Sequence, residues 1–417
     1  MQTVKEVIQE TNTARELKLK RIYYVWNYRE WGGAQIYFFG LIREMRKIAE
    51  VTILLPANSD LQLIKFIEQL NVNYEFLNYA SDVSRATGIS RKLQRHWRKI
   101  RSEFEIFDYF RRLDLKSSII HIEFAPWQSL LVLTYLCIRA RVFITMHNSL
   151  PPVSKLRYLL WMLKFAVISR FSSFNIFPSN EDAKKSLLPL VSPDLYERTR
   201  VTYTNVDPDE VDEALQAPLD RTGLTEKFDL PADKFLVFCV GQFIDRKGRW
   251  TFLDAAKRLN EVDKEIAFVW ISNSQPNESD PRIVAEYWLE RDFILITSDK
   301  IGGEHIDLFK LMRLADVFVL ASFQEGLPIS LLEAMALGIP SISTNVNAIP
   351  EAVKHLETGW LIEAGDDKHL ADAISALKAD PDLRAKLSKN GREFVMAHFN
   401  EKVVAQIAFE TYLKSFE

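Results

Sequence analysis

The sequence predicts an α/β protein built from two doubly wound parallel sheets. Short apolar runs alternate with helical segments along most of the chain, which is the pattern of strands covered by helices on both faces. At 417 residues the chain is long for one hydrophobic core, and it suits two domains of about 200 residues each. Its hydrophobic content of 47% is ordinary for a globular protein.

A first strand–helix series defines a predicted domain over residues 1–206. A helix from about Gln35 to Ile48 follows the first strand. The expected strands are Arg21–Asn27, Val51–Pro56 and Val72–Leu77, and three more that start at Ser118, Arg141 and Phe174.

A second series defines a predicted domain over residues 234–398, with strands that start at Phe235, Glu265, Phe293, Val317 and Ser341. Residues 207–233 are acidic and contain three prolines, so we expect an interdomain linker there. Residues 399–417 predict an amphipathic helix. Its apolar face is expected to hold Val403, Ile407, Tyr412 and Phe416.

The formal net charge of −3 conceals an asymmetry between the two halves. Residues 1–200 carry 30 Lys and Arg against 19 Asp and Glu, a charge of +11, and the remainder carries −14. The first half is therefore expected to meet an anionic partner. No signal peptide or run of 18 uncharged apolar residues occurs, and both cysteines lie in apolar runs, so we expect a cytoplasmic protein.

The segment Ala321–Ser343 carries the most specific pattern in the chain. An apolar strand leads into a Glu325-Gly326 turn, and Pro328 opens a helix. The first amides of a helix have no partner within it, and the helix dipole favours negative charge there. Glu325 and Glu333 can hold hydroxyls at two ends of one elongated ligand. The alternative, a core helix with a solvated Glu333, gives no reason for the Glu-Gly turn.

The run E-G-x-P-x-x-x-x-E-A-M-A-x-G-x-P over residues 325–340 resembles the E-x7-E signature of the retaining glycosyltransferases of family 4 (group 1). The resemblance implies the GT-B fold, in which two Rossmann-like domains face each other across a cleft. It implies that Glu333 binds the ribose of a nucleotide-sugar donor and that Glu325 acts at the sugar. It also implies that the helix 399–417 crosses back to the first domain. The backbone expected to hold the sugar is Gly326, Leu327, Pro328, Ile329 and Ser330.

Two further loops match the family in part. Gly32 and Gly33 follow the first strand, where the family's Gly-Gly-Ala loop faces the donor diphosphate; a dinucleotide G-x-G-x-x-G motif is not present. In G-Q-F-I-D-R-K-G (241–248), Lys247 matches the family's lysine and Gln242 replaces its arginine. Either Arg246, four residues further on, takes over the missing phosphate contact, or the donor binds more weakly, and the sequence leaves both outcomes open.

Histidines end two strands of the first half. His147 stands where the family has a histidine that contacts the transferred sugar, and we assign it a catalytic role on that resemblance. A lone histidine at a strand end is otherwise more often structural. His121 and Glu123 occupy the position of the family's H-x-H, with Glu123 in place of the second histidine, so acceptor contacts are expected to differ.

Asp207-Pro208-Asp209 forms a D-x-D, which holds a metal in other glycosyltransferases. We expect Asp209 to cap a helix instead. No Cys/His cluster has metal-ligand spacing. We therefore predict no metal and no cofactor, since the nucleotide-sugar is a substrate.

Arg91–Arg101 holds six Lys and Arg and no acid. An apolar stripe at helical spacing runs beside it. The segment suits peripheral contact with an anionic membrane at its inner face, or a surface helix packed on the domain, and the sequence favours neither. Nucleic-acid binding is not predicted, because no recognised fold accompanies the charge. The stripe consists of Leu93, Trp97, Ile100, Phe104 and Phe107.

The function predicted is retaining, metal-independent transfer of a hexose-type sugar from a nucleotide-sugar to a hydroxyl of a glycan or lipid-linked acceptor, in polysaccharide or glycolipid synthesis. Two other classes remain open. One is a sugar-nucleotide epimerase or phosphorylase on a similar fold. The other is an inactive paralogue that binds a nucleotide or glycan. The replacement of the family's arginine by Gln242 is the reason to retain this alternative.

Overall fold

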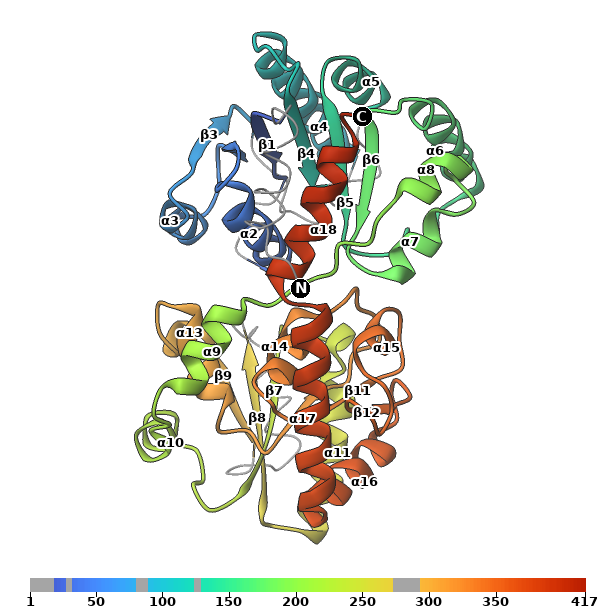
Figure 1. The fold of residues 1–417 in the computed structure, drawn as a ribbon. Helices are drawn as coiled ribbons and strands as arrows, with labels where there is room; N and C mark the ends of the chain where they lie inside the picture. The colour runs from blue at the N-terminus through green and yellow to red at the C-terminus, as the bar shows by residue number, and fades with distance from the viewer. Residues whose placement is uncertain (1–18, 28–31, 80–88, 124–128, 273–292) are drawn as a thin grey trace. The chain divides into compact units, whose positions relative to one another are not determined.

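The structure, a computed structural model, describes residues 19–27, 32–79, 89–123, 129–272 and 293–417 (Figure 1). The chain divides into two compact units. Unit 1 comprises Met1–Tyr203 and Glu401–Glu417, and unit 2 comprises Thr204–Asn400. Each unit contains one six-stranded parallel sheet with flanking helices, which confirms the predicted α/β class.

The sheet of unit 1 has the strand order β3-β2-β1-β4-β5-β6. The chain begins at the central β1, adds β2 and β3 toward one edge, and then returns to the other side of β1. The carboxyl ends of β1 and β4 therefore flank a topological switch point, where ligands bind in open α/β sheets. The strands are β1 (Arg21–Val25), β2 (Glu50–Pro56), β3 (Asn73–Leu77), β4 (Ser118–Glu123), β5 (Arg141–Met146) and β6 (Phe174–Pro178).

Side chains of β1 alternate between two cores, one on each face of this sheet. Tyr24 packs with α2, α3 and α18, whereas Val25 packs with α4, α5 and α6. The helices of unit 1 are α2 (Gly33–Met45), α3 (Leu61–Gln69), α4 (Ile89–Arg111), α5 (Leu130–Arg139), α6 (Lys155–Ile168), α7 (Glu181–Leu187), α8 (Pro193–Arg198) and α18 (Glu401–Lys414).

The last helix, α18, lies against α2 in unit 1 (Figure 1). Its buried face differs from the predicted stripe, because only Tyr412 of that stripe is fully buried, and Val403 and Ile407 are half-buried. The alanines on this helix allow close packing, which turns a different face inward. The fully buried side chains are Val404, Ala405, Ala408, Phe409 and Tyr412.

Unit 2 repeats the topology, with the strand order β12-β11-β10-β7-β8-β9 and a switch point between β7 and β10. Its strands are β7 (Phe235–Val240), β8 (Ile266–Ser272), β9 (Phe293–Thr297), β10 (Val317–Leu320), β11 (Ser341–Thr344) and β12 (Trp360–Ile362). Its α-helices are α9 (Pro208–Gln216), α10 (Arg221–Phe228), α11 (Arg249–Val262), α13 (His305–Met312), α14 (Ile329–Ala336), α15 (Ile349–Ala352), α16 (Asp367–Ala379) and α17 (Pro381–His398). The described part of the unit also contains two 3-10 turns, η1 (Asp245–Lys247) and η2 (Ser298–Lys300).

Residues 207–233, expected as a linker, instead form α9 and α10 and belong to unit 2. The reason is local. Pro208 occupies the first turn of α9, where proline is tolerated, and Asp207 caps the helix by accepting from the amides of Asp209 and Glu210. The cap is thus Asp207 and not Asp209. Helix α9 then packs against α13.

Within the described part of the chain, no helix combines the length and apolarity needed to span a bilayer.

Candidate active site

Two loops meet at the switch point of unit 2, and both carry predicted site residues. Lys247 Nζ, after β7, donates to Glu325 Oε1, after β10, at 2.6 Å. Arg246 Nη1 lies 3.5 Å from Glu325 Oε2 and donates to the carbonyl of Gln324. Ser322 Oγ donates to Glu325 Oε1 at 2.6 Å. The structure therefore gathers one carboxylate and two cations where the topology places a ligand.

Gly248 allows these two loops to approach each other. Its φ of +76° is left-handed, and a Cβ there would lie 1.9 Å from the carbonyl oxygen of Ala321. Beside it, the Phe323 amide donates to the Arg246 carbonyl at 2.9 Å. A larger residue at 248 would separate the loops, so the glycine sets the distance between Lys247 and Glu325.

Helix α14 begins directly after this cluster. Pro328 is its N-cap, and no side chain among the described residues caps it, so its first-turn amides face no side-chain acceptor. Ser330, a predicted donor-binding residue, directs its hydroxyl to the Val240 carbonyl at the end of β7, at 3.0 Å. Leu327 is buried, whereas Ile329 is half-buried. In this structure the Ser330 hydroxyl ties α14 to β7, and the amides remain for a ligand.

Glu333 lies inside α14 and contacts a histidine that sequence reasoning missed. Its Oε1 is 3.1 Å from His305 Nε2, and His305 Nδ1 is 2.9 Å from Glu210 Oε2. Burial lowers the pKa of His305, but the charges of the two carboxylates outweigh it and raise the pKa to about 10. The imidazolium therefore stays charged at neutral pH. No local motif links residues 210, 305 and 333, so the sequence offered no signal for this group.

Gln242, which replaces the family's arginine, has an exposed side chain after β7. Arg246 is also exposed, whereas Lys247 is largely covered. Both cations of this loop, Arg246 and Lys247, thus contact the carboxylate of Glu325, and Lys247 lies closer to it.

In unit 1, His147 follows β5 and faces Glu123 at the end of β4. Its Nε2 lies 3.8 Å from Glu123 Oε1, which is longer than a hydrogen bond. Neither this nitrogen nor the two carboxylate oxygens of Glu123 have a hydrogen-bond partner among the described residues. Burial lowers the pKa of His147 to about 4 and raises the pKa of Glu123 to about 8. Burial therefore favours the uncharged form of both groups.

His121, on the same strand as Glu123, has a structural role here. It is fully buried, its Nδ1 shares a 2.6 Å hydrogen bond with Tyr412 of α18, and its Nε2 shares one of 2.6 Å with Thr145. Both ring nitrogens are thus used inside the unit, which leaves none for an acceptor. Glu123 is the member of the pair that lacks a partner among the described residues.

Gly32 and Gly33 open α2 after β1. Gly32 is the N-cap in an extended conformation, and no described side chain caps the helix. Figure 1 shows α2 beside β1. The preceding residues of the predicted loop, 28–31, lie outside the described part of the chain.

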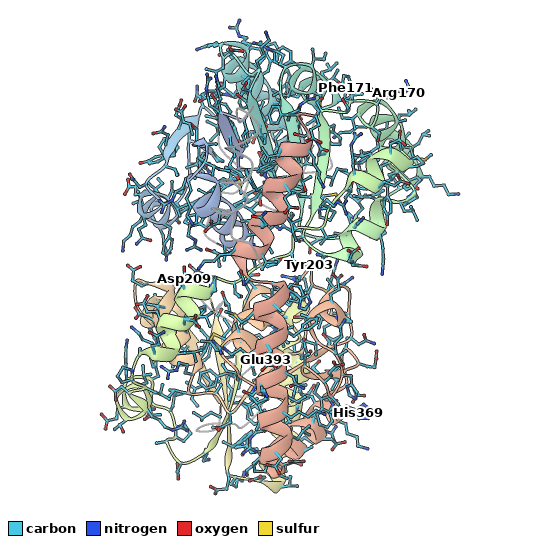
Figure 2. The ribbon with its side chains drawn as sticks, in the orientation of Figure 1. Arg170, Phe171, Tyr203, Asp209, His369 and Glu393 are labelled. Atoms are coloured by element: carbon cyan, nitrogen blue, oxygen red, sulfur yellow. The ribbon has the colours of Figure 1, made fainter. Side chains whose placement is uncertain are left out.

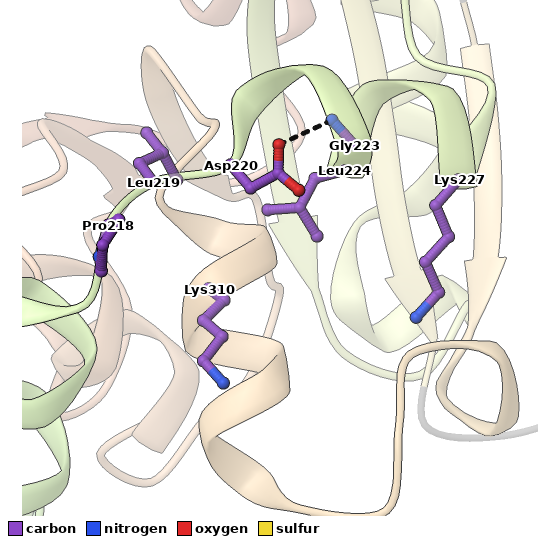
Figure 3. A pocket seen from close by; sticks show the side chains of 7 residues that line it. All are labelled: Pro218, Leu219, Asp220, Gly223, Leu224, Lys227 and Lys310. Atoms are coloured by element: carbon purple, nitrogen blue, oxygen red, sulfur yellow. Dashed lines mark hydrogen bonds between the residues drawn. The ribbon is translucent and has the colours of Figure 1, made fainter.

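Two other kinds of site are less favoured. Over the described ranges, no group of three or more His, Cys, Asp and Glu side chains is arranged to hold a metal ion. A pocket of ≈ 290 Å³ in unit 2 is lined by Pro218, Asp220, Lys227 and Lys310 and their neighbours (Figure 3). Both lysines already contact protein oxygens, and the pocket contains none of the predicted site residues.

Comparison with known proteins gives a family match within unit 2. Residues 220–394 match the family described as "Glycosyl transferases group 1". The chain is 32% identical over 182 residues to the putative colanic acid biosynthesis glycosyltransferase WcaL of Escherichia coli, covering 42% of this chain and 44% of WcaL. It is 29% identical over 201 residues to an E. coli UDP-Gal:alpha-D-GlcNAc-diphosphoundecaprenol alpha-1,3-galactosyltransferase, covering 47% and 50%. The matches thus span about half the length of these curated relatives.

The fold is similar over nearly the whole chain to Anabaena Alr3699/HepE in complex with UDP. The TM-score is 0.71 at 17% identity, covering 94% of this chain and 99% of HepE. This likeness confirms the GT-B class of fold. The Glu325–Glu333 segment lies inside residues 220–394, the region that is similar to the group 1 glycosyl transferases.

Proposed function

We propose that this protein is a glycosyltransferase that moves a hexose-type sugar from a nucleotide-sugar donor to a hydroxyl of a glycan or lipid-linked acceptor. The observation that carries the proposal is the carboxylate of Glu325, held by Lys247 and Ser322 at the switch point of unit 2. Support comes from the relatives, whose names include a colanic acid glycosyltransferase and an enzyme acting on a diphosphoundecaprenol-linked sugar.

The donor's parts can be assigned to residues. The diphosphate would displace Glu325 as the partner of Lys247 and Arg246, since both cations lie at the end of β7. Glu325 and the amides at the start of α14 would hold the sugar. Glu333, oriented by His305, would accept hydrogen bonds from the ribose hydroxyls. In unit 1, Gly32 and Gly33 would donate amides to the diphosphate, and His147 would contact the transferred sugar.

The transfer we propose proceeds with retention and without a metal. The bond from the anomeric carbon to the diphosphate oxygen breaks, and the acceptor oxygen bonds to that carbon on the same face. The acceptor's proton passes to the departing diphosphate oxygen. Lys247 and Arg246 stabilise the charge that develops on the leaving group, which is the usual source of a large part of the rate enhancement.

We also propose that α4 contacts an anionic bilayer. Of the stripe predicted on this helix, Trp97, Ile100 and Phe104 are exposed, so the helix does not pack on the unit through that face. Phe107 instead packs against Tyr135 of α5. Leu93 lies outside the residues whose side chains are described.

Titration calorimetry against a panel of nucleoside diphosphates, followed by turnover with mass-spectrometric detection, tests the proposal. We expect one diphosphate to bind and its sugar nucleotide to release it only when an acceptor is present. Release of the nucleoside diphosphate without an acceptor, together with a changed configuration of the sugar, would indicate an epimerase. Transfer of the sugar to inorganic phosphate would indicate a phosphorylase. Binding without turnover would indicate the inactive paralogue.

A further inference from the structure

Helix α6 is apolar apart from Lys155, Arg157 and Lys164, yet the residues that the structure describes cover only one of its faces. Trp161, Phe165 and Ile168 pack in the core on one face of the unit 1 sheet. A helix that is apolar all round is normally buried on every side. On α6 the opposite face is exposed, with Leu156 at 69% and Leu163 at 57%. The exposed stripe, at spacings of three and four residues, consists of Leu156, Leu159, Leu160, Leu163 and Val167.

The two neighbouring helices extend this stripe. Helix α5 contacts both α4 and α6, and all three contribute to the same core beneath them. Their outward side chains therefore point away from one side of the sheet. On α5 these include Leu131, which is 82% exposed, and Ile138, and on α4 they are Trp97, Ile100 and Phe104. We call the outward side chains of α4, α5 and α6 the apolar face.

The charged side chains of α5 and α6 are all basic. No Asp or Glu occurs anywhere from residue 124 to residue 180. Lys155 and Arg157 are exposed in the first turn of α6, and the exposed Arg170 follows its end (Figure 2). On α4, Arg98 and Arg101 are exposed, and this helix also carries Glu103, Glu105 and Asp108, with Glu105 4.0 Å from Arg101. An apolar stripe bordered by cations is typical of helices that lie in a membrane interface, where the stripe enters the acyl boundary and the cations meet anionic headgroups.

We infer that the apolar face is a membrane-insertion surface, with α6 lying in the plane of an anionic lipid bilayer. A second copy of the chain is a poorer occupant, because a two-fold contact through this face would bring the same cations against one another. The inference rests on the proposed bilayer contact of α4 and deepens it, since it adds an apolar component supplied by α5 and α6. It does not depend on the nucleotide-sugar site.

Vesicle co-sedimentation of the full chain separates the two components. The vesicles contain phosphatidylglycerol and phosphatidylcholine, or phosphatidylcholine alone, at low and high salt. The variant L159E/L163E places two carboxylates in the stripe of α6. Its matched control is L61E/V262E, which makes the same charge change at two exposed apolar positions on α3 and α11. R98Q/R101Q tests the α4 contact separately.

We expect the wild-type chain and the control to bind anionic vesicles alike, and some binding to persist at high salt because apolar burial is not screened. L159E/L163E should lose at least tenfold in vesicle affinity. Loss in R98Q/R101Q alone, with L159E/L163E unchanged, would overturn insertion by α6 and leave the α4 contact standing. A wild-type dimer in sedimentation equilibrium that L159E/L163E dissociates would overturn the bilayer as occupant. Circular dichroism confirms that each variant is folded.

Discussion

His305 lies between two carboxylates of unit 2, 3.1 Å from Glu333 and 2.9 Å from Glu210. It joins α9, α13 and α14 at the residue that we assign to the ribose. The charge pair is largely buried, because Glu333 is 2% exposed. Removing one member of a buried pair leaves the other without compensation, which is costly.

His305→Gln should therefore destabilise unit 2 by about 3–5 kcal/mol, the usual cost of breaking a buried ion pair. Denaturant unfolding measures this, and Glu333→Gln in the same chain should restore part of the loss. The nucleotide affinity of a folded His305→Gln should also fall, since Glu333 loses its orientation. Unchanged stability would mean that the pair does not form.

The same pair makes stability depend on pH. Because the pKa of His305 is raised from 6.5 to about 10, its contribution is fully present below pH 6.5 and is lost as the pH rises through about 10. Wild-type melting temperatures should decline between pH 7 and 10 more steeply than those of His305→Gln. Parallel curves would contradict the assignment.

Glu123 should make the stability of unit 1 depend on pH, over a pH range different from that of His305. Its pKa is raised from 4.5 to about 8 by burial, so its contribution is present below pH 4.5 and is lost as the pH rises through about 8. The slope is at most about 1.4 kcal/mol per pH unit. Glu123→Gln should remove it, and the variant should exceed the wild type in free energy of unfolding at pH 8.5. Equal slopes in both proteins from pH 6.5 to 8 would show that the carboxyl is already ionised.

Glu325→Gln should reduce turnover severely without weakening nucleoside diphosphate binding, because the diphosphate displaces Glu325 from Lys247 and Arg246. Loss of one group that stabilises developing charge typically costs about 3–4 kcal/mol in the barrier. Single-turnover kinetics measure the effect. The exposed Glu357 of unit 2 supplies the control, since Glu357→Gln makes the same change away from the cluster. Near-normal turnover in Glu325→Gln would remove this residue from the mechanism.

Lys247→Ala should weaken nucleoside diphosphate binding more than Arg246→Ala, because Lys247 is the more buried cation and the closer to Glu325. Calorimetry with each variant decides this. Comparable losses would indicate that Arg246 has replaced the contact that Gln242 cannot make. If neither variant loses affinity, the diphosphate binds elsewhere.

Both strand–helix series and the Glu325 cluster could be predicted because their signals are local. Apolar runs mark strands buried on both faces, and the Glu-Gly turn, Pro328 and Glu333 lie within nine consecutive residues. The contact of Glu333 with His305 could not be predicted from the sequence, because His305 reaches Glu333 only through tertiary packing. Likewise Pro208 signals a helix start as well as a linker, and the composition of residues 207–233 does not distinguish the two.

The sequence also could not predict which face of a helix is buried. On α18 the small alanines, and not the larger Val403 and Ile407, face the core, because close packing against α2 favours small side chains. On α6 apolar residues occur all round, so periodicity cannot say which face the protein itself covers. Only the folded structure shows that one face of α6 is exposed.

The two segments of unit 1 are separated by all of unit 2, and this has a consequence for synthesis. Phe409 and Tyr412 of α18 complete one of the two cores of unit 1, and Tyr412 bonds to His121 inside it. A ribosome must therefore release residues 401–417 before that core can close, whereas the contiguous residues of unit 2 emerge earlier. The part of unit 1 that is made before unit 2 can complete its core only after unit 2 has emerged, and a nascent chain arrested before residue 401 leaves the surface of α2 without its covering helix.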